Sequence, residues 1–388
     1  MEKKVERIKK EGVVVGIDAS RNRSGGAKSH LVGILTQDDP FKYGVREVHL
    51  WSYQSLLNLV PDQPWLVKHN PKELEKPLYQ QLYWQCFRLP SEIIKAGCEI
   101  ILNTDAGTIS RFRPSITMSR DMLSYEPGEI ERFGFSRARL RLILLRYIQN
   151  NALRRANGAV FLTRYASEVI QRSCGPLSRV AHIPHGVSEK FKASKTPKLR
   201  IVEKSQPIEC LYISNAALYK HQWIVVKAIA VLRDRGYNIR LTLVGGGSGK
   251  AKKLLDNQIE ISDPNNSFVV QRPFVPQNKL PDYLEKADIF IFASSCENMP
   301  NTLIEAMAMG LPIACSNRGP MPEVLEGGGV YFDPENSISI AKKIEMIIND
   351  PELCQRIASK AKQISNQYTW SRCAEETWKY IVEIYNSV

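Results

Sequence analysis

Two glutamates stand eight residues apart in the stretch SSCENMPNTLIEAMAMGLPIACS, residues 294–316: Glu297 and Glu305. Ionised carboxylates repel an anion, but they accept hydrogen bonds well from neutral hydroxyls. A polyol such as a sugar offers many hydroxyls. The spacing alone is common in chains of this length, and Glu305 could equally be a solvated helix residue.

The elements around the pair explain why both glutamates could serve one ligand. The apolar run DIFIFAS predicts a buried strand, and a helix follows, with Asn298 as its cap and Pro300 at its first position. Gly310 and Pro312 end that helix before a second apolar run. Helix N-termini attract anions, so the amides of residues 301–303 predict a phosphate site between the glutamates. A nucleotide-sugar has both a phosphate and sugar hydroxyls. Glu305 would bind its ribose, and Glu297 would bind the transferred sugar.

Residues 294–334, continuing through SNRGPMPEVLEGGGVYFDP, resemble the C-terminal signature of glycosyltransferase family 4. The paired glutamates of that family match Glu297 and Glu305. The resemblance implies an α/β protein of the GT-B fold, with two Rossmann-like domains whose parallel sheets face each other across a cleft. It also implies a retaining transferase of the kind found in bacterial O-antigen and capsule synthesis. In that family the leaving phosphate is thought to help deprotonate the acceptor.

Lys220 precedes a predicted helix with apolar positions at 225, 228, 229 and 232, where its charge could bind a diphosphate. The family has an arginine five residues before this lysine, and Asn215 stands there instead. Either Lys220 acts alone or another cation replaces the arginine, because the charge of the leaving diphosphate must be balanced.

Two features of the first half resemble the family in part. Gly25 and Gly26 follow the strand VVVGID, where glycines would let the backbone approach a phosphate or simply form a loop. Many members place a histidine and an aspartate after a later strand, and Arg120 and Asp121 stand there in this chain. Asp121 is expected either to orient an acceptor hydroxyl or to make a structural hydrogen bond.

The expected site thus has two sets of residues. The catalytic set is Glu297, Lys220 and Asp121. In the donor set, backbone groups near Arg272 are expected to bind the nucleobase, without indicating which base. The donor set is Gly25, Gly26, Asn215, Lys220, Gly245, Arg272, Phe274, Glu297, Asn298, Met299, Pro300, Asn301, Thr302, Leu303 and Glu305. No metal-binding motif is evident, and no cofactor is expected because the nucleotide-sugar, UDP- or GDP-linked, is a substrate.

Composition limits the class of protein. The 388 residues are 43% hydrophobic and 24% charged, which is typical of a soluble globular protein with two domains. No run of 18 apolar residues, secretion signal or nucleic-acid module is visible, and eight scattered cysteines favour a reducing compartment. The net charge is +13, and residues 1–190 carry 29 Lys and Arg against 19 Asp and Glu, which favours an acidic partner.

A basic amphipathic helix is predicted at residues 136–157, where six arginines alternate with apolar residues at helical spacing. We expect its apolar face to pack on the sheet, while the arginines gather at an anionic membrane or acceptor. The turn that includes His185 and Gly186 ends the first half, and the lysine-rich residues 189–206 are predicted to be the linker.

The expected organisation is therefore an acceptor-side domain at 1–187, a nucleotide-sugar domain at 188–369 and a final helix at 370–388 that crosses back. The expected partners are a nucleotide-sugar donor and a saccharide or lipid-linked saccharide acceptor, without nucleic acid. The expected localisation is cytoplasmic, either free or peripheral on an anionic membrane at its inner face. Three alternatives stay open: a soluble transferase with a small acceptor, a non-catalytic nucleotide-sugar-binding protein, and a membrane-binding scaffold without chemistry.

Overall fold

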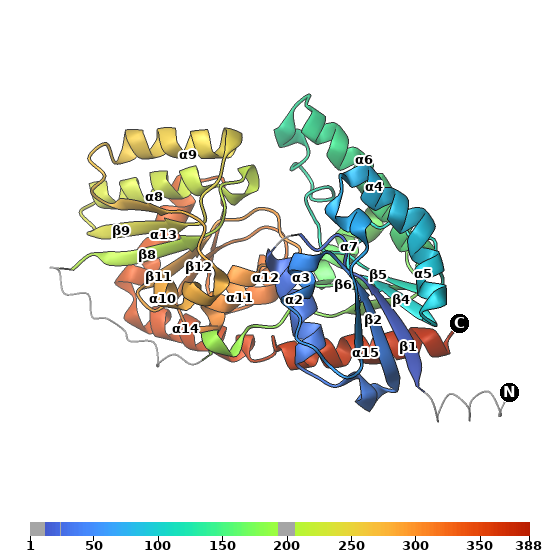
Figure 1. Ribbon diagram of the computed structural model, residues 1–388. Helices are drawn as coiled ribbons and strands as arrows, with labels where there is room; N and C mark the ends of the chain where they lie inside the picture. The colour runs from blue at the N-terminus through green and yellow to red at the C-terminus, as the bar shows by residue number, and fades with distance from the viewer. Residues whose placement is uncertain (1–11, 24, 193–205) are drawn as a thin grey trace. The chain divides into compact units, whose positions relative to one another are not determined.

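The apolar runs of the sequence form the strands of two parallel sheets, as the computed structural model shows (Figure 1). The structure describes residues 12–23, 25–192 and 206–388. The chain divides into two compact units: Met1–Gly186 with Thr369–Val388 form unit 1, and Val187–Tyr368 form unit 2. The charged N-terminal residues 1–11 and most of the predicted linker lie outside the described residues.

Unit 1 contains a seven-stranded parallel sheet in the order β3-β2-β1-β4-β5-β6-β7. Its central strands are buried on both faces, which explains their continuous Val, Ile and Leu runs. The elements of unit 1 are β1 (Val13–Asp18), α2 (Gly25–Thr36), η1 (Pro40–Tyr43), β2 (Val45–Trp51), α3 (Gln54–Leu57), β3 (Leu66–His69), η2 (Lys72–Glu75), α4 (Leu78–Tyr83), the π-helical turn η3 (Trp84–Arg88), α5 (Leu89–Lys95), β4 (Ile100–Asn103), β5 (Ser115–Met118), η4 (Glu131–Phe133), α6 (Arg137–Arg155), β6 (Gly158–Phe161), α7 (Arg164–Cys174), β7 (Val180–His182) and α15 (Trp370–Asn386).

Unit 2 contains a six-stranded parallel sheet in the order β10-β9-β8-β11-β12-β13. The order reverses between β8 and β11, and parallel sheets bind ligands at the carboxyl ends of the strands at such a point. The elements are η5 (Glu189–Phe191), β8 (Ile208–Ile213), η6 (Leu218–Lys220), α8 (Gln222–Asp234), β9 (Ile239–Val244), α9 (Gly249–Ser262), β10 (Val269–Arg272), η7 (Gln277–Lys279), α10 (Leu280–Leu284), β11 (Ile289–Phe292), α11 (Asn301–Ala308), β12 (Ile313–Ser316), α12 (Met321–Leu325), β13 (Val330–Phe332), α13 (Ser337–Asn349) and α14 (Pro351–Ser365).

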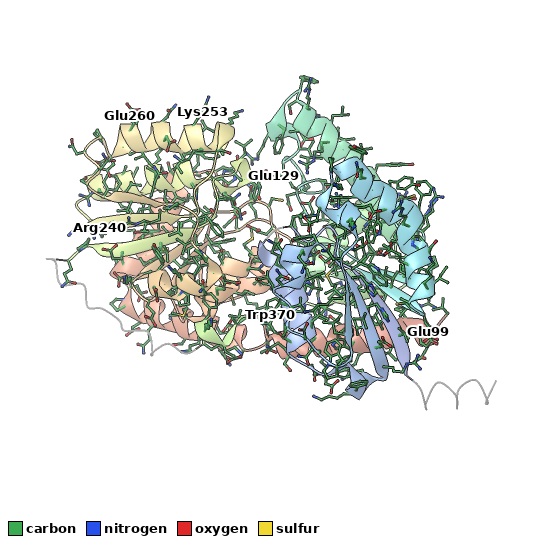
Figure 2. The ribbon with its side chains drawn as sticks, viewed as in Figure 1. Glu99, Glu129, Arg240, Lys253, Glu260 and Trp370 are labelled. Carbon is green, nitrogen blue, oxygen red and sulfur yellow. The ribbon has the colours of Figure 1, made fainter. Side chains whose placement is uncertain are left out.

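The last helix of the chain, α15, packs against α2 of unit 1. Trp370, at the start of α15, is labelled in Figure 2. Two glycines allow its close approach: a Cβ at Gly33 would lie 2.4 Å from the Trp370 ring, and a Cβ at Gly186 would lie 2.1 Å from the Trp370 amide nitrogen. The buried His185 ring lies beside Trp370 and 4.3 Å from His30, which makes it a packing residue of the turn.

The prediction that the apolar face of the helix at 136–157 packs on the sheet is wrong for most of that face. In α6 the residues that are buried are Leu142, Gln149, Ala152 and Leu153. Leu140, Ile143, Leu144 and Tyr147 are instead exposed. The helix does pack on unit 1, against α7, but with the opposite side of its surface.

The eight cysteines are all free, and six of them are buried. Within the described residues, no helix has both the length and the hydropathy needed to cross a membrane.

Candidate active site

The loops that follow β8, β9 and β10 meet at the carboxyl edge of the sheet in unit 2. The Ala216 amide donates to the Gly246 carbonyl at 2.7 Å, and the Gly245 amide donates to the Arg272 carbonyl at 3.1 Å. Gly245 has a φ of 141°, and a Cβ there would lie 2.3 Å from the Ser214 carbonyl oxygen. Gly245 therefore permits the backbone packing that places Asn215 and Arg272 at one edge.

Lys220 and Glu297, 77 residues apart, form an ion pair between the lysine Nζ and the glutamate Oε1. Lys220 ends η6 after β8, and Glu297 lies in the loop after β11, the neighbouring strand. Their side chains are only 11% and 16% exposed, so little water screens the pair. Lys220 was predicted to bind a diphosphate and Glu297 a sugar. The structure pairs these two side chains with each other.

Hydrogen bonds that involve His221 and Ser295 join the two backbone segments that carry the ion pair. The Ser295 amide donates to the Tyr219 carbonyl at 2.8 Å, and the buried His221 Nε2 lies 2.9 Å from the Ser295 hydroxyl oxygen. His221 has a φ of 48°, a left-handed conformation that is uncommon for a residue with a side chain. Sequence reasoning missed both residues, and only the position of His221 beside Lys220 could have drawn attention to it.

Glu305 lies inside the body of unit 2, on α11, and is 3% exposed. Its Oε1 accepts a hydrogen bond from the Gln277 side chain at 2.6 Å, and its Oε2 has no hydrogen-bond partner in the part of the chain that the structure describes. Burial raises the pKa of Glu305 to about 7, although the Gln277 amide opposes that rise. A buried carboxylate with an unused oxygen is suited to accept a ligand hydroxyl.

We expect nucleotide affinity to depend on the ionisation of Glu305. Ribose hydroxyls donate best to the ionised carboxylate, so lowering the pH below about 7 should weaken binding about tenfold per unit. Glu305→Ala should cost roughly 1.5–3 kcal/mol of nucleotide binding at alkaline pH. Calorimetry of the wild type and of the uncharged Glu305→Gln variant across pH 5–9 measures both effects.

The Glu305→Gln variant serves as the control because titration of the nucleotide phosphate affects both proteins equally. The readout is therefore the difference between the two pH profiles. Identical profiles, or wild-type affinity in Glu305→Ala, would exclude contact between Glu305 and the ribose.

The N-terminus of α11 differs from the prediction. The helix begins at Asn301, the residue before it is Pro300, and no side chain caps it, so the prediction of Asn298 as the cap is wrong. Pro300 precedes the helix because its ψ of 81° is not helical. The amides of Asn301 and Leu303 donate to the carbonyls of Met299 and Pro300, so two of the three amides predicted for the phosphate already donate within the turn.

In unit 1, Arg120 and the Gly25–Gly26 segment lie together at the start of α2. The Arg120 guanidinium donates to the Gly26 carbonyl at 3.0 Å and to the Ala27 carbonyl at 3.4 Å, and burial lowers its pKa to about 10. A Cβ at Gly25 would meet no atom within 4 Å, so packing does not require glycine there. Arg120, which stands where the family often has a histidine, therefore holds the glycine segment in place.

Asp121 follows β5 in the same unit. Its Oδ1 accepts the Leu123 amide at 3.0 Å, which is the structural hydrogen bond considered above. Burial raises the pKa of Asp121, and the nearby Asp105 carboxylate raises it further. A hydrogen bond from the Gln149 side chain opposes the rise in pKa, and the acceptor role of Asp121 stays a prediction.

Arg272 and Phe274 line a groove that does not include the Lys220–Glu297 ion pair. This groove of about 810 Å³ lies beside α10, and Arg240 and Tyr283 also line it. The described residues that line this groove do not include Lys220, Glu297 or Glu305. The groove is therefore not the space between the two glutamates.

Comparison with known proteins agrees with this geometry. Residues 195–364 match the family model "Glycosyl transferases group 1". An uncharacterized glycosyltransferase of Haemophilus influenzae is 29% identical over 177 residues, which are 44% of this chain and 48% of that protein. The O-antigen chain mannosyltransferase B of Escherichia coli is 28% identical over 104 residues, 27% of each chain. The match thus spans about half the length of the first relative and less of the second.

Among solved structures, Anabaena HepE in complex with UDP-glucose superposes with a TM-score of 0.69 at 18% identity, covering 97% of this chain and 100% of that one. At this identity the likeness concerns the fold alone. Both units, each built on a parallel sheet, are included in the match. Residues 195–364 therefore match the glycosyl transferases group 1 family, and the chain has the GT-B fold.

Proposed function

We propose that the chain transfers a hexose from a nucleotide-sugar to an acceptor hydroxyl with retention of the anomeric configuration. The observation that carries the proposal is the partly buried Lys220–Glu297 ion pair at the carboxyl edge of β8 and β11, with buried Glu305 on the helix that follows. A binding protein has no need to place a carboxylate against its phosphate-binding lysine, because that carboxylate repels the ligand.

In the proposed reaction, the bond between the anomeric carbon and the diphosphate oxygen breaks, and the acceptor oxygen bonds to the same carbon. Lys220 stabilises the negative charge that develops on the leaving diphosphate, and Glu297 stabilises the positive charge on the sugar. The acceptor proton passes to a phosphate oxygen of the leaving group. Glu305 holds the ribose, and Asp121 of unit 1 orients the acceptor hydroxyl.

The proposed donor is UDP- or GDP-linked. The structural likeness to a protein crystallised with UDP-glucose supports a uridine nucleotide. The proposed setting is synthesis of a bacterial cell-surface polysaccharide, with a saccharide or lipid-linked saccharide as the acceptor. The O-antigen mannosyltransferase among the relatives and the charge of +10 on residues 1–190 support this setting.

The test combines a thermal-shift panel with a donor assay. Unfolding of the purified chain is followed with UDP, GDP, TDP and ADP, and the matching nucleotide at ~100 times its dissociation constant should add about 2.7 kcal/mol of stability. The corresponding nucleotide-sugars are then tested for slow hydrolysis and for transfer to glycan acceptors. Stabilisation without any turnover would leave a nucleotide-sugar-binding protein, and no stabilisation by any of the four nucleotides would reject the proposal.

A further inference from the structure

Helix α6 exposes a continuous apolar stripe to solvent. Leu140, Ile143, Leu144 and Tyr147 have exposed fractions between 41% and 71% and together span about 100° of the helix circumference. The buried Leu142 lies on the opposite side of the helix. Contiguous exposed apolar surface of this kind is uncommon on a monomer and marks a surface that another body covers.

Arginines border this stripe on both sides. By the helical period, Arg137 and Arg141 lie on one flank, and Arg139 and Arg146 lie on the other. The 19 residues of α6 contain six arginines and no acidic residue. Within the described residues no ion pair joins any of these four arginines to a carboxylate, although the charge of Arg141 acts on the nearby Asp121.

A second exposed stripe lies on α4 and η3. Tyr79, Tyr83 and Phe87 recur every four residues, are between 55% and 67% exposed, and the last two rings lie 5.2 Å apart. No residue of α4 is buried.

The loop at residues 104–114 contacts both the η3 turn and helix α6 within unit 1. The Ile109 amide donates to the Gln85 side chain at 3.2 Å, and the Arg111 guanidinium lies 5.3 Å from the centre of the Phe87 ring. At the other end of the loop, a Cβ at Gly107 would touch the Leu145 side chain of α6 at 3.7 Å. We call these two stripes and their arginines the α4–α6 surface.

We propose that the α4–α6 surface docks on an anionic lipid bilayer, with α6 lying in the plane of the interface. A helix that carries leucines on one stripe and arginines on both flanks can place the leucines among acyl chains while the guanidinium groups reach the phosphates. Tyrosine rings suit the headgroup layer, because one end is apolar and the other is polar. Charge complementarity favours a bilayer over a protein, because an anionic membrane offers phosphates on both flanks of such a stripe without any need for specific pairing.

The inference goes beyond the proposed reaction and does not depend on it, since docking needs neither donor nor acceptor. The test is flotation of the intact chain with vesicles that contain phosphatidylglycerol, beside vesicles of phosphatidylcholine alone. We expect binding to the first that weakens with salt and little binding to the second. Reversal of all four arginines to glutamate should weaken binding by about 600-fold or more, at roughly fivefold for each arginine.

The matched control reverses four exposed cations of unit 2: Lys253, Lys342, Arg356 and Lys360. Lys253 points away from the sheet on the outer side of α9 (Figure 2). The control removes as much net charge, so a general electrostatic effect would appear in both variants. Equal loss in the two variants, or no loss in the α6 variant, would overturn the proposal.

A second pair of variants separates insertion from charge alone. Leu140→Ser with Leu144→Ser should weaken vesicle binding about tenfold or more, because two leucines no longer enter the acyl region. The control pair, Ile261→Ser with Ile338→Ser, changes exposed isoleucines of unit 2 and should bind as the wild type does. If instead light scattering shows that the wild type is a dimer that the leucine variant dissociates, the partner is a second copy and the bilayer proposal is wrong.

Discussion

Replacing Lys220 with alanine is expected to lower donor affinity by roughly 100-fold or more and to slow turnover as well. The loss exceeds that of an ordinary lysine, because Glu297 then keeps its charge without a partner and repels the diphosphate. Asn215, which stands in place of an arginine, cannot share the charge. Calorimetry with the nucleotide diphosphate and single-turnover rates measure both effects.

Two rescue variants make this expectation specific. Adding Glu297→Ala to Lys220→Ala should restore part of the nucleotide affinity, because the repelling carboxylate is gone, although turnover stays low. Adding Asn215→Arg to Lys220→Ala should restore some of both, because Asn215 is exposed at the end of β8, from which an arginine can reach the same edge. Failure of both rescues would mean that Lys220 does not contact the diphosphate.

Replacing Glu297 alone should slow turnover without lowering nucleotide affinity. In Glu297→Ala, Lys220 is released from its ion pair, so affinity for the free nucleotide should stay the same or rise. Turnover should fall by about 10²–10³, since the carboxylate acts on charge that exists only in the transition state. The comparison of nucleotide affinity with the single-turnover rate separates the two effects.

Glu297→Gln provides the matched control, because it keeps the size of the side chain and its ability to accept a hydrogen bond. If charge is what matters, Glu297→Gln should be about as slow as Glu297→Ala. Should Glu297→Ala lose nucleotide affinity as severely as Lys220→Ala and keep its turnover, the assignment of sugar to Glu297 and diphosphate to Lys220 is wrong.

The strands were predictable because a strand that is buried on both faces leaves an unmistakable apolar run, as in VVVGID and DIFIFAS. The outward stripe of α6 was not predictable in the same way. Helical spacing of apolar residues shows that a helix has an apolar face, but it does not show what covers that face. The same pattern fits Leu140 and Leu144 on a sheet or at a lipid surface, and we expected the sheet.

For the site, the resemblance supplied Lys220, Glu297 and Glu305, but not their electrostatics. The ion pair depends on β8 and β11 being neighbours, which is a property of the strand order. The raised pKa of Glu305 depends on its burial and on Gln277, 28 residues away in the sequence. The left-handed conformation of His221 carries no signal in the sequence, because glycine is the residue that normally indicates such a conformation.

The packing of α15 on α2 has a consequence for biosynthesis. Unit 1 needs residues from both ends of the chain, whereas all of unit 2 lies between them. During translation, unit 2 can fold as soon as residue 368 has left the ribosome, while His30 and Gly33 of α2 still lack the helix against which they pack. The first domain to be synthesised is thus the last to be completed, and a nascent chain that stops short of Trp370 leaves exposed the face of α2 that packs on α15.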